Sequence, residues 1–144
     1  MLWQRINRED AEKVFCIVQN VAGATVTANY PVVWDITSPD GVKVSKPASA
    51  TLSLFVGIAN KDIADSAYGL IQVYGYRASA YMTNDTTVAI AAGNILIPVD
   101  AQWYLARSGA SDGKSGFIFA AEAVATAVTT LVAGANKKCF VRAL

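Results

Sequence analysis

The chain has 144 residues, a net charge of +1 from 12 basic and 11 acidic residues, and no histidine. This length suits one domain, and the balanced charge offers no basic tract to neutralise a phosphate backbone, so we expect no nucleic-acid partner. The absence of histidine removes the commonest general base and the commonest metal ligand, which argues against an enzyme.

The chain is poor in charge. Charged residues make up 16% of it and apolar residues 53%, whereas about 25% of a typical soluble domain is charged. Two interpretations are open. Either part of the surface is covered by another molecule, or the alanine and valine of an ordinary β core raise the apolar count.

The first 13 residues are polar and charged, and they are compatible with one helical turn or with an extended arm. They hold no apolar run of the signal-peptide kind, so we expect a soluble protein that is made inside a cell. Residues 14–20 then predict a first strand. Residues 25–35 predict a second, with Pro31 at a sheet edge or a bend.

A strong turn signal, Ser-Pro-Asp-Gly, occupies residues 38–41. Alternating apolar and polar residues predict strands over 42–45 and 51–58, with a loop over 60–66. One face of the second of these strands is expected to carry Leu52, Leu54, Val56 and Ile58.

The most informative stretch is residues 63–81, IADSAYGLIQVYGYRASAY, which predicts a long strand with aromatic residues around a glycine. Ile71 and Val73 are expected to share a face with Arg77. The other face is expected to carry Leu70, Gln72, Tyr74 and Tyr76. Neither face is fully polar, so we expect both to be covered, one of them by a partner subunit.

Residues 87–99 are again strand-like, with a break at 93–94, and they echo residues 25–34 as a small internal repeat. Closing strands are predicted over 117–121 and 138–143, with strand and loop over 123–132. Many short strands with closely spaced turns predict an all-β protein. We expect a small single-domain antiparallel β-sandwich or barrel over residues 14–144, preceded by an N-terminal arm over 1–13.

Motifs for chemistry are missing or incomplete. Residues 108–115 approach a phosphate-binding loop, but Gly109 is one residue too close to the Gly-Lys-Ser that ends it, and a strand-like GFIFA follows. Asp62 and Asp65 form neither a calcium loop nor a spaced pair of catalytic acids. We therefore predict no catalytic residue, no cofactor site and no metal site.

The apolar run over residues 117–135 is rich in alanine and contains Glu122, so we reject it as a membrane span. Cys16 and Cys139 both lie in apolar runs. They are predicted to be either two buried thiols or a disulfide between the first and last strands.

Aromatic residues mark the candidate interfaces, because tyrosine and tryptophan bury a large area at little entropic cost. Trp34 is expected in the core. The candidate interface residues are Trp3, Arg5, Arg8, Tyr74, Tyr76, Arg77, Trp103 and Tyr104.

The block IA…DIAD…AYGLIQVYGYRASA and the closing GFIFAAEA…KCFVRAL resemble small decoration, or cement, proteins on the heads of tailed bacteriophages. The similarity runs over residues 11–144. It implies a non-enzymatic, cofactor-free structural protein that binds the outer capsid surface and clamps neighbouring capsomers. The major capsid protein would be its partner.

The resemblance further implies a homo-oligomer, with a trimer favoured, located on the virion and made in the cytoplasm of a bacterial host. A second hypothesis is a tail or fibre module that binds a host surface. In that case Trp103 and Tyr104, beside the loop over 108–116, would form a glycan platform.

Overall fold

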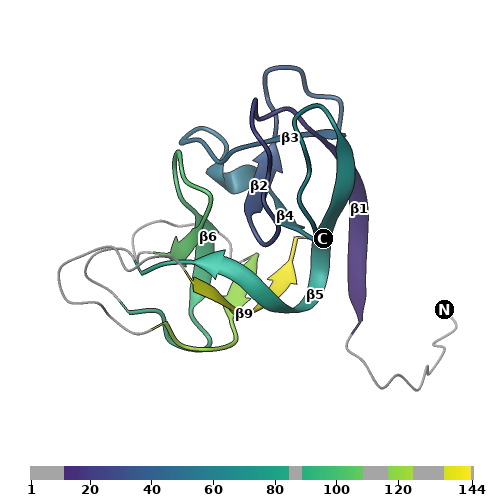
Figure 1. The fold of residues 1–144 in the computed structure, drawn as a ribbon. Coiled ribbons are helices and arrows are strands. Elements are labelled where there is room, and N and C mark those ends of the chain that lie inside the picture. The colour runs from purple at the N-terminus through teal and green to yellow at the C-terminus, as the bar shows by residue number, and fades with distance from the viewer. Residues whose placement is uncertain (1–11, 85–88, 109–116, 125–134, 144) are drawn as a thin grey trace, which may run out of the picture.

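The computed structural model describes residues 12–84, 89–108, 117–124 and 135–143. These residues form nine strands of one mixed sheet and a short 3-10 turn, η1 (Leu52–Leu54) (Figure 1). The strands are β1 (Lys13–Asn20), β2 (Pro31–Trp34), β3 (Lys43–Ser45), β4 (Phe55–Ala59), β5 (Tyr68–Met82), β6 (Ile95–Pro98), β7 (Leu105–Arg107), β8 (Ile118–Ala120) and β9 (Ala135–Arg142). The all-β prediction is confirmed.

The strand order closes the sheet into two rings of five strands. The linear order is β1-β3-β2-β4-β5-β7-β6-β8-β9, and β1 and β9 both pair again with β5. The 15-residue β5 therefore belongs to both rings and passes from one half of the molecule into the other (Figure 1). β1 pairs with β3 in parallel, as β5 does with β7, so the sheet is mixed rather than purely antiparallel.

The two rings repeat one topology. When the five strands of each ring are numbered along the chain, they pair in the same order and direction in both rings, namely first, third, second, fourth and fifth. In each ring an isolated bridge also links the segment before the second strand to the segment after the fourth. The bridges are Val26–Ile63 and Ile90–Val124. A left-handed residue follows each bridge at the same distance, Asn29 with φ 74° and Gly93 with φ 86°. The predicted repeat between residues 25–34 and 87–99 agrees with this arrangement.

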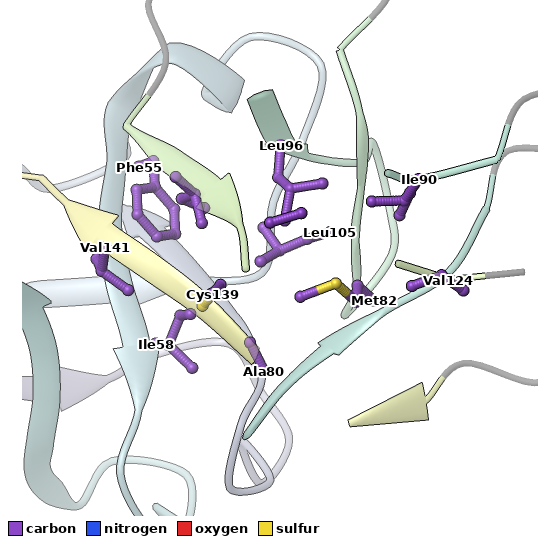
Figure 2. Close-up of a cluster of buried hydrophobic side chains, with 12 residues drawn as sticks. Phe55, Ile58, Ala80, Met82, Ile90, Leu96, Leu105, Val124, Cys139 and Val141 are labelled. Atoms are coloured by element: carbon purple, nitrogen blue, oxygen red, sulfur yellow. The ribbon is translucent and has the colours of Figure 1, made fainter. Parts of the chain in front are cut away.

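Each ring encloses an apolar cluster, and β4 contributes to both. The first cluster contains Val18, Val26, Val32, Val44, Val56, Ala59, Ile63, Ile71 and Val73. The second contains residues of the other half, such as Met82, Leu96, Leu105, Cys139 and Val141, together with Phe55 and Ile58 of β4 (Figure 2). All five residues of β4 are buried. β4 is therefore buried on both faces along its whole length, and it packs the two halves together.

The predicted strand over residues 51–58 is wrong in its first part. Residues 52–54 form the 3-10 turn η1, and the strand begins at Phe55. Val56 and Ile58 also enter different clusters. The pairing of β2 with β4 shifts register between Val32 and Val33, and such a bulge interrupts the simple alternation of side chains.

β5 is distorted where it leaves the first ring. Gly75 has φ 102°, and a Cβ atom there would collide with the carbonyl oxygen of Glu12. The side-chain amide nitrogen of Gln72 lies 3.1–3.3 Å from the carbonyl oxygens of Tyr74, Gly75 and Tyr76 and donates to them. A residue other than glycine would be strained at this point, so Gly75 sets the path of β5 between the rings.

Several predictions concern residues that are only partly described. Of the predicted arm over residues 1–13, only Glu12 and Lys13 are described, and Lys13 already belongs to β1. Of the segment 123–132, only residues 123–124 are described.

Candidate functional site

Alternation along β1 divides its side chains between the first core and the outside. Val14, Cys16 and Val18 belong to the first cluster or pack against it. Phe15 and Ile17, between them, point outward and are exposed. β1 thus presents apolar side chains on both faces, although only one face has a core to cover it.

The outward side of β1 continues onto β5. Ile17 lies directly opposite Leu70, and Gln19 lies opposite Tyr68, so these side chains share one face of the sheet. The exposed fractions are 39% for Phe15, 68% for Ile17, 65% for Tyr68 and 45% for Leu70. We call these four residues the β1–β5 face.

The β1–β5 face is unusual because its members are contiguous. Single exposed apolar residues are normal on soluble proteins, but a cluster of large ones marks an interaction surface. β1 also pairs with β3 only through Gln19 and Asn20. Within the described chain, residues 13–18 therefore have a strand partner on one edge only, and an open apolar edge favours association with another molecule.

A pocket of about 200 Å³ opens beside this face, at the junction of the two rings. Phe15 belongs to both the pocket and the β1–β5 face. The residues that line the pocket are Lys13, Phe15, Asn29, Asn60, Gln72, Arg77, Ala78 and Ser79. We call it the junction pocket.

Arg77 lies at the inner end of the junction pocket and is only 7% exposed. Its Nε donates to the carbonyl oxygen of Ser79 (2.6 Å) and its Nη1 to Oε1 of Gln72 (3.1 Å). Its Nη2 donates to Oδ1 of Asn29 (2.8 Å) and to the carbonyl oxygen of Ala59 (2.7 Å). The guanidinium group therefore joins β5 to β4 and to the turn before β2.

These contacts correct the sequence analysis. Arg77 was predicted to share a face with Ile71 and Val73, but its side chain is buried and contacts Gln72. β5 shifts register beside Val73 and again after Arg77, and such bulges interrupt the simple alternation of side chains. Burial lowers the pKa of the Arg77 guanidinium. The group nevertheless stays charged at neutral pH, because arginine starts from a pKa above 12.

Sequence analysis missed Asn29 and Gln72 as members of this network. Asn29 adopts a left-handed conformation, which asparagine tolerates better than most residues, and its backbone N–H donates to the carbonyl oxygen of Ala59. The only signal in the sequence was an asparagine in the middle of a strand-like run. Gln72 gave no signal, because its partners are set by the bend in β5.

The other predicted interface residues are half-buried where the structure describes them. Tyr74 is half-buried and meets Phe140 edge-on, with ring centroids 5.5 Å apart. Tyr76 and Tyr104 are also half-buried. Trp103 stacks on Tyr30 at 5.5 Å. Trp3, Arg5 and Arg8 lie outside the described residues.

Trp103 and Tyr30 belong to a small aromatic cluster beside the first core. Tyr30 also packs against Tyr81 at 5.4 Å, and the Lys46 ammonium lies 5.6 Å from the centre of the Trp103 ring. One face of Trp103 therefore packs inside the domain. Trp34 is half-buried against the first core, in line with its predicted core position.

Side chains that could support chemistry are dispersed. Within the described residues, no group of three histidine, cysteine, aspartate or glutamate side chains could hold a metal ion. Asp62 accepts a hydrogen bond from the backbone N–H of Ala28, and Asp65 accepts one from Gly23, so both carboxylates hold loops.

Cys16 and Cys139 are free thiols rather than a disulfide. Burial raises the pKa of Cys139 to about 12 and also raises the pKa of Cys16. Thiols in this state behave as small apolar side chains, because the thiolate is the reactive form.

Comparison with known proteins gives no relative from which a function could be transferred. No protein-family model matches the chain, and no curated protein is significantly similar to it. In the part of the chain that the structure describes, no helix has the length and apolar character needed to cross a membrane. The functional argument therefore rests on the residues, the β1–β5 face and the junction pocket.

Proposed function

We propose that this protein is a non-enzymatic structural component of a tailed-phage virion that binds the outer capsid surface and clamps neighbouring capsomers. The observation that carries the proposal is the β1–β5 face, four large exposed apolar side chains next to a strand edge that has no partner among the described residues. The resemblance of the sequence to phage decoration proteins supplies the capsid as the surface to be bound. The major capsid protein would be the direct partner.

Stabilisation would follow from mass action. A protein that binds the assembled shell and not its free subunits shifts the equilibrium toward the shell. Many copies on a symmetric lattice add to this effect, and a homo-oligomer, with a trimer favoured, would engage several capsomers at once. Native mass spectrometry of the purified protein checks the oligomeric state.

The test is to heat capsids with and without the bound protein and to compare wild type with Ile17→Ser. Ile17 is 68% exposed at the centre of the face, and loss of a central apolar contact is expected to weaken shell binding about tenfold. Ile36→Ser is the matched control, since Ile36 is 51% exposed and lies outside the face. Equal melting of capsids with and without the protein contradicts the cement role.

A tail or fibre module that binds host glycans is the alternative. It has less support because the ring of Trp103 already stacks on Tyr30 and lies beneath Lys46. Electron microscopy of labelled particles separates the two proposals. Density on capsid lattice positions supports the first, and density on the tail supports the second.

A further inference from the structure

The junction pocket has a one-sided charge pattern. Among the described residues that line it, two carry positive charge, three carry side-chain amides and none is acidic. The cations are Lys13 and Arg77, and the amides are Asn29, Asn60 and Gln72. Asn29 and Gln72 accept from Arg77 with their amide oxygens, so Asn60 is the amide whose donors are left for a ligand. A small pocket with this lining favours an anion over a cation or a neutral apolar group.

The charge of Arg77 is not balanced by a carboxylate in the described part of the chain. All four of its acceptors there are neutral oxygens. Of its five N–H groups, one on Nη1 has no acceptor among the described residues. Buried charges are normally paired, because an unpaired charge is expensive to remove from water. An anion in the junction pocket would supply the missing counter-charge.

The described acidic residues do not fill this role from within the pocket, because none of them lines it. Glu12 and Asp62 do not line the pocket, and Asp62 is bonded to the backbone of Ala28. Cys139 faces Arg77 across the pairing of β5 with β9, but burial keeps its thiol protonated, with a pKa of about 12. Among the described residues, no carboxylate therefore reaches Arg77 through the pocket.

Lys13 and Asn60 add further hydrogen-bond donors to the lining of the junction pocket. Lys13 is exposed and makes no ion pair with the described residues, and the side-chain amide of Asn60 has no hydrogen bond among them. Asn29 turns its Oδ1 toward Arg77, so its NH₂ group points elsewhere. Phe15 forms an apolar wall on the side of the β1–β5 face.

We propose that the junction pocket binds the carboxylate of an aspartate or glutamate side chain from a protein partner. Arg77 and Lys13 would provide the charge, and Phe15 would contact the aliphatic part of the same side chain. A single carboxylate has two oxygens, one for the unused arginine donor and one for the Lys13 ammonium, whereas a phosphate group has three strong acceptor oxygens to satisfy. The inference does not depend on where the protein acts, because any protein partner can present such a side chain.

The test titrates the full-length protein with N-acetyl-glutamate amide and follows the Nε–H signal of Arg77 and the side-chain amide of Asn60 by NMR. We expect saturable shifts at both groups. Lys13→Gln should weaken binding about threefold, as expected for one exposed charge. Lys46→Gln is the control, since Lys46 lies over Trp103, outside the pocket, and it should leave binding unchanged.

A second variant tests the position of the site. Asn60→Asp places a carboxylate of the same shape in the pocket wall, and it should abolish binding of the probe while the spectrum stays folded. Three results overturn the proposal: equal shifts with the neutral N-acetyl-glutamine amide, binding of inorganic phosphate as tight as that of the carboxylate, or full binding in the folded Asn60→Asp variant. If Asn60→Asp does not fold, the two lysine variants and the neutral probe still decide the outcome.

Discussion

Replacing Ile58 with alanine should test whether β4 holds the two rings together. Ile58 lies on β4, which belongs to the first ring, but its side chain is fully buried in the cluster of the second (Figure 2). The substitution removes three carbon atoms from the contact between the two halves. Ile17→Ala makes the same chemical change on β1, where the side chain is 68% exposed.

The expected magnitudes differ widely. Truncation of a buried isoleucine costs the lost burial and leaves a cavity, for a total of about 3–4 kcal/mol of unfolding free energy. For a domain of this size each kcal/mol lowers Tm by about 2–4 °C, so we expect a decrease of roughly 10 °C for Ile58→Ala. Ile17→Ala should change the unfolding free energy by less than about 0.5 kcal/mol, because its site is exposed.

Urea denaturation followed by tryptophan fluorescence and by far-ultraviolet circular dichroism measures both variants. Because β4 and β5 contribute to both halves, we expect the two signals to change together in a single transition. A loss below about 1 kcal/mol for Ile58→Ala, or an equal loss for Ile17→Ala, refutes the packing argument. Two separated transitions in the wild type refute the claim that the rings form one cooperative unit.

Three further predictions concern single positions. Gly75→Ala should destabilise the fold by about 3 kcal/mol or more, measured by the same denaturation, because Gly75 has φ 102° and its Cβ would collide with backbone at the start of β1; a neutral effect contradicts this. Two backbone N–H groups and Lys43 lower the pKa of Asp40 to about 2 from 3.8. Wild type should therefore be more stable than Asp40→Asn above pH 4, and this difference in unfolding free energy should disappear as pH falls toward 2. A difference independent of pH contradicts this. Burial raises the pKa of Cys139 to about 12, so iodoacetamide should alkylate it at pH 8 only when the protein unfolds, as mass spectrometry can show; rapid labelling of the folded protein contradicts this.

Local pattern was sufficient to find individual strands. Alternating or continuous apolar runs bounded by turn residues predicted β1, β3, β8 and most of β5, and the structure contains all four. These elements depend on residues that are close in sequence. The closure of the sheet into two rings could not be predicted, because it depends on which distant strands pair and in which direction.

The junction pocket could not be predicted from the sequence for a related reason. Arg77 and Asn29 are separated by 48 positions, and they meet where the irregular part of β5 lies against the turn before β2. A regular strand would have turned Arg77 to the other face. The error about Arg77 therefore has a local physical origin, because β5 contains a left-handed glycine and two register shifts that a regular strand would lack.

The lengths of the strands account for the number of rings. β1 and β9 have eight residues each and serve one ring, whereas β5 has 15 and serves two. β5 is the last strand of the first ring and the first strand of the second, so no linker separates the two rings and neither can rotate independently of the other. By the same geometry, a last strand twice as long as β9 would offer an edge with which the strands of a third ring could pair, so the length of the shared strand limits the number of rings.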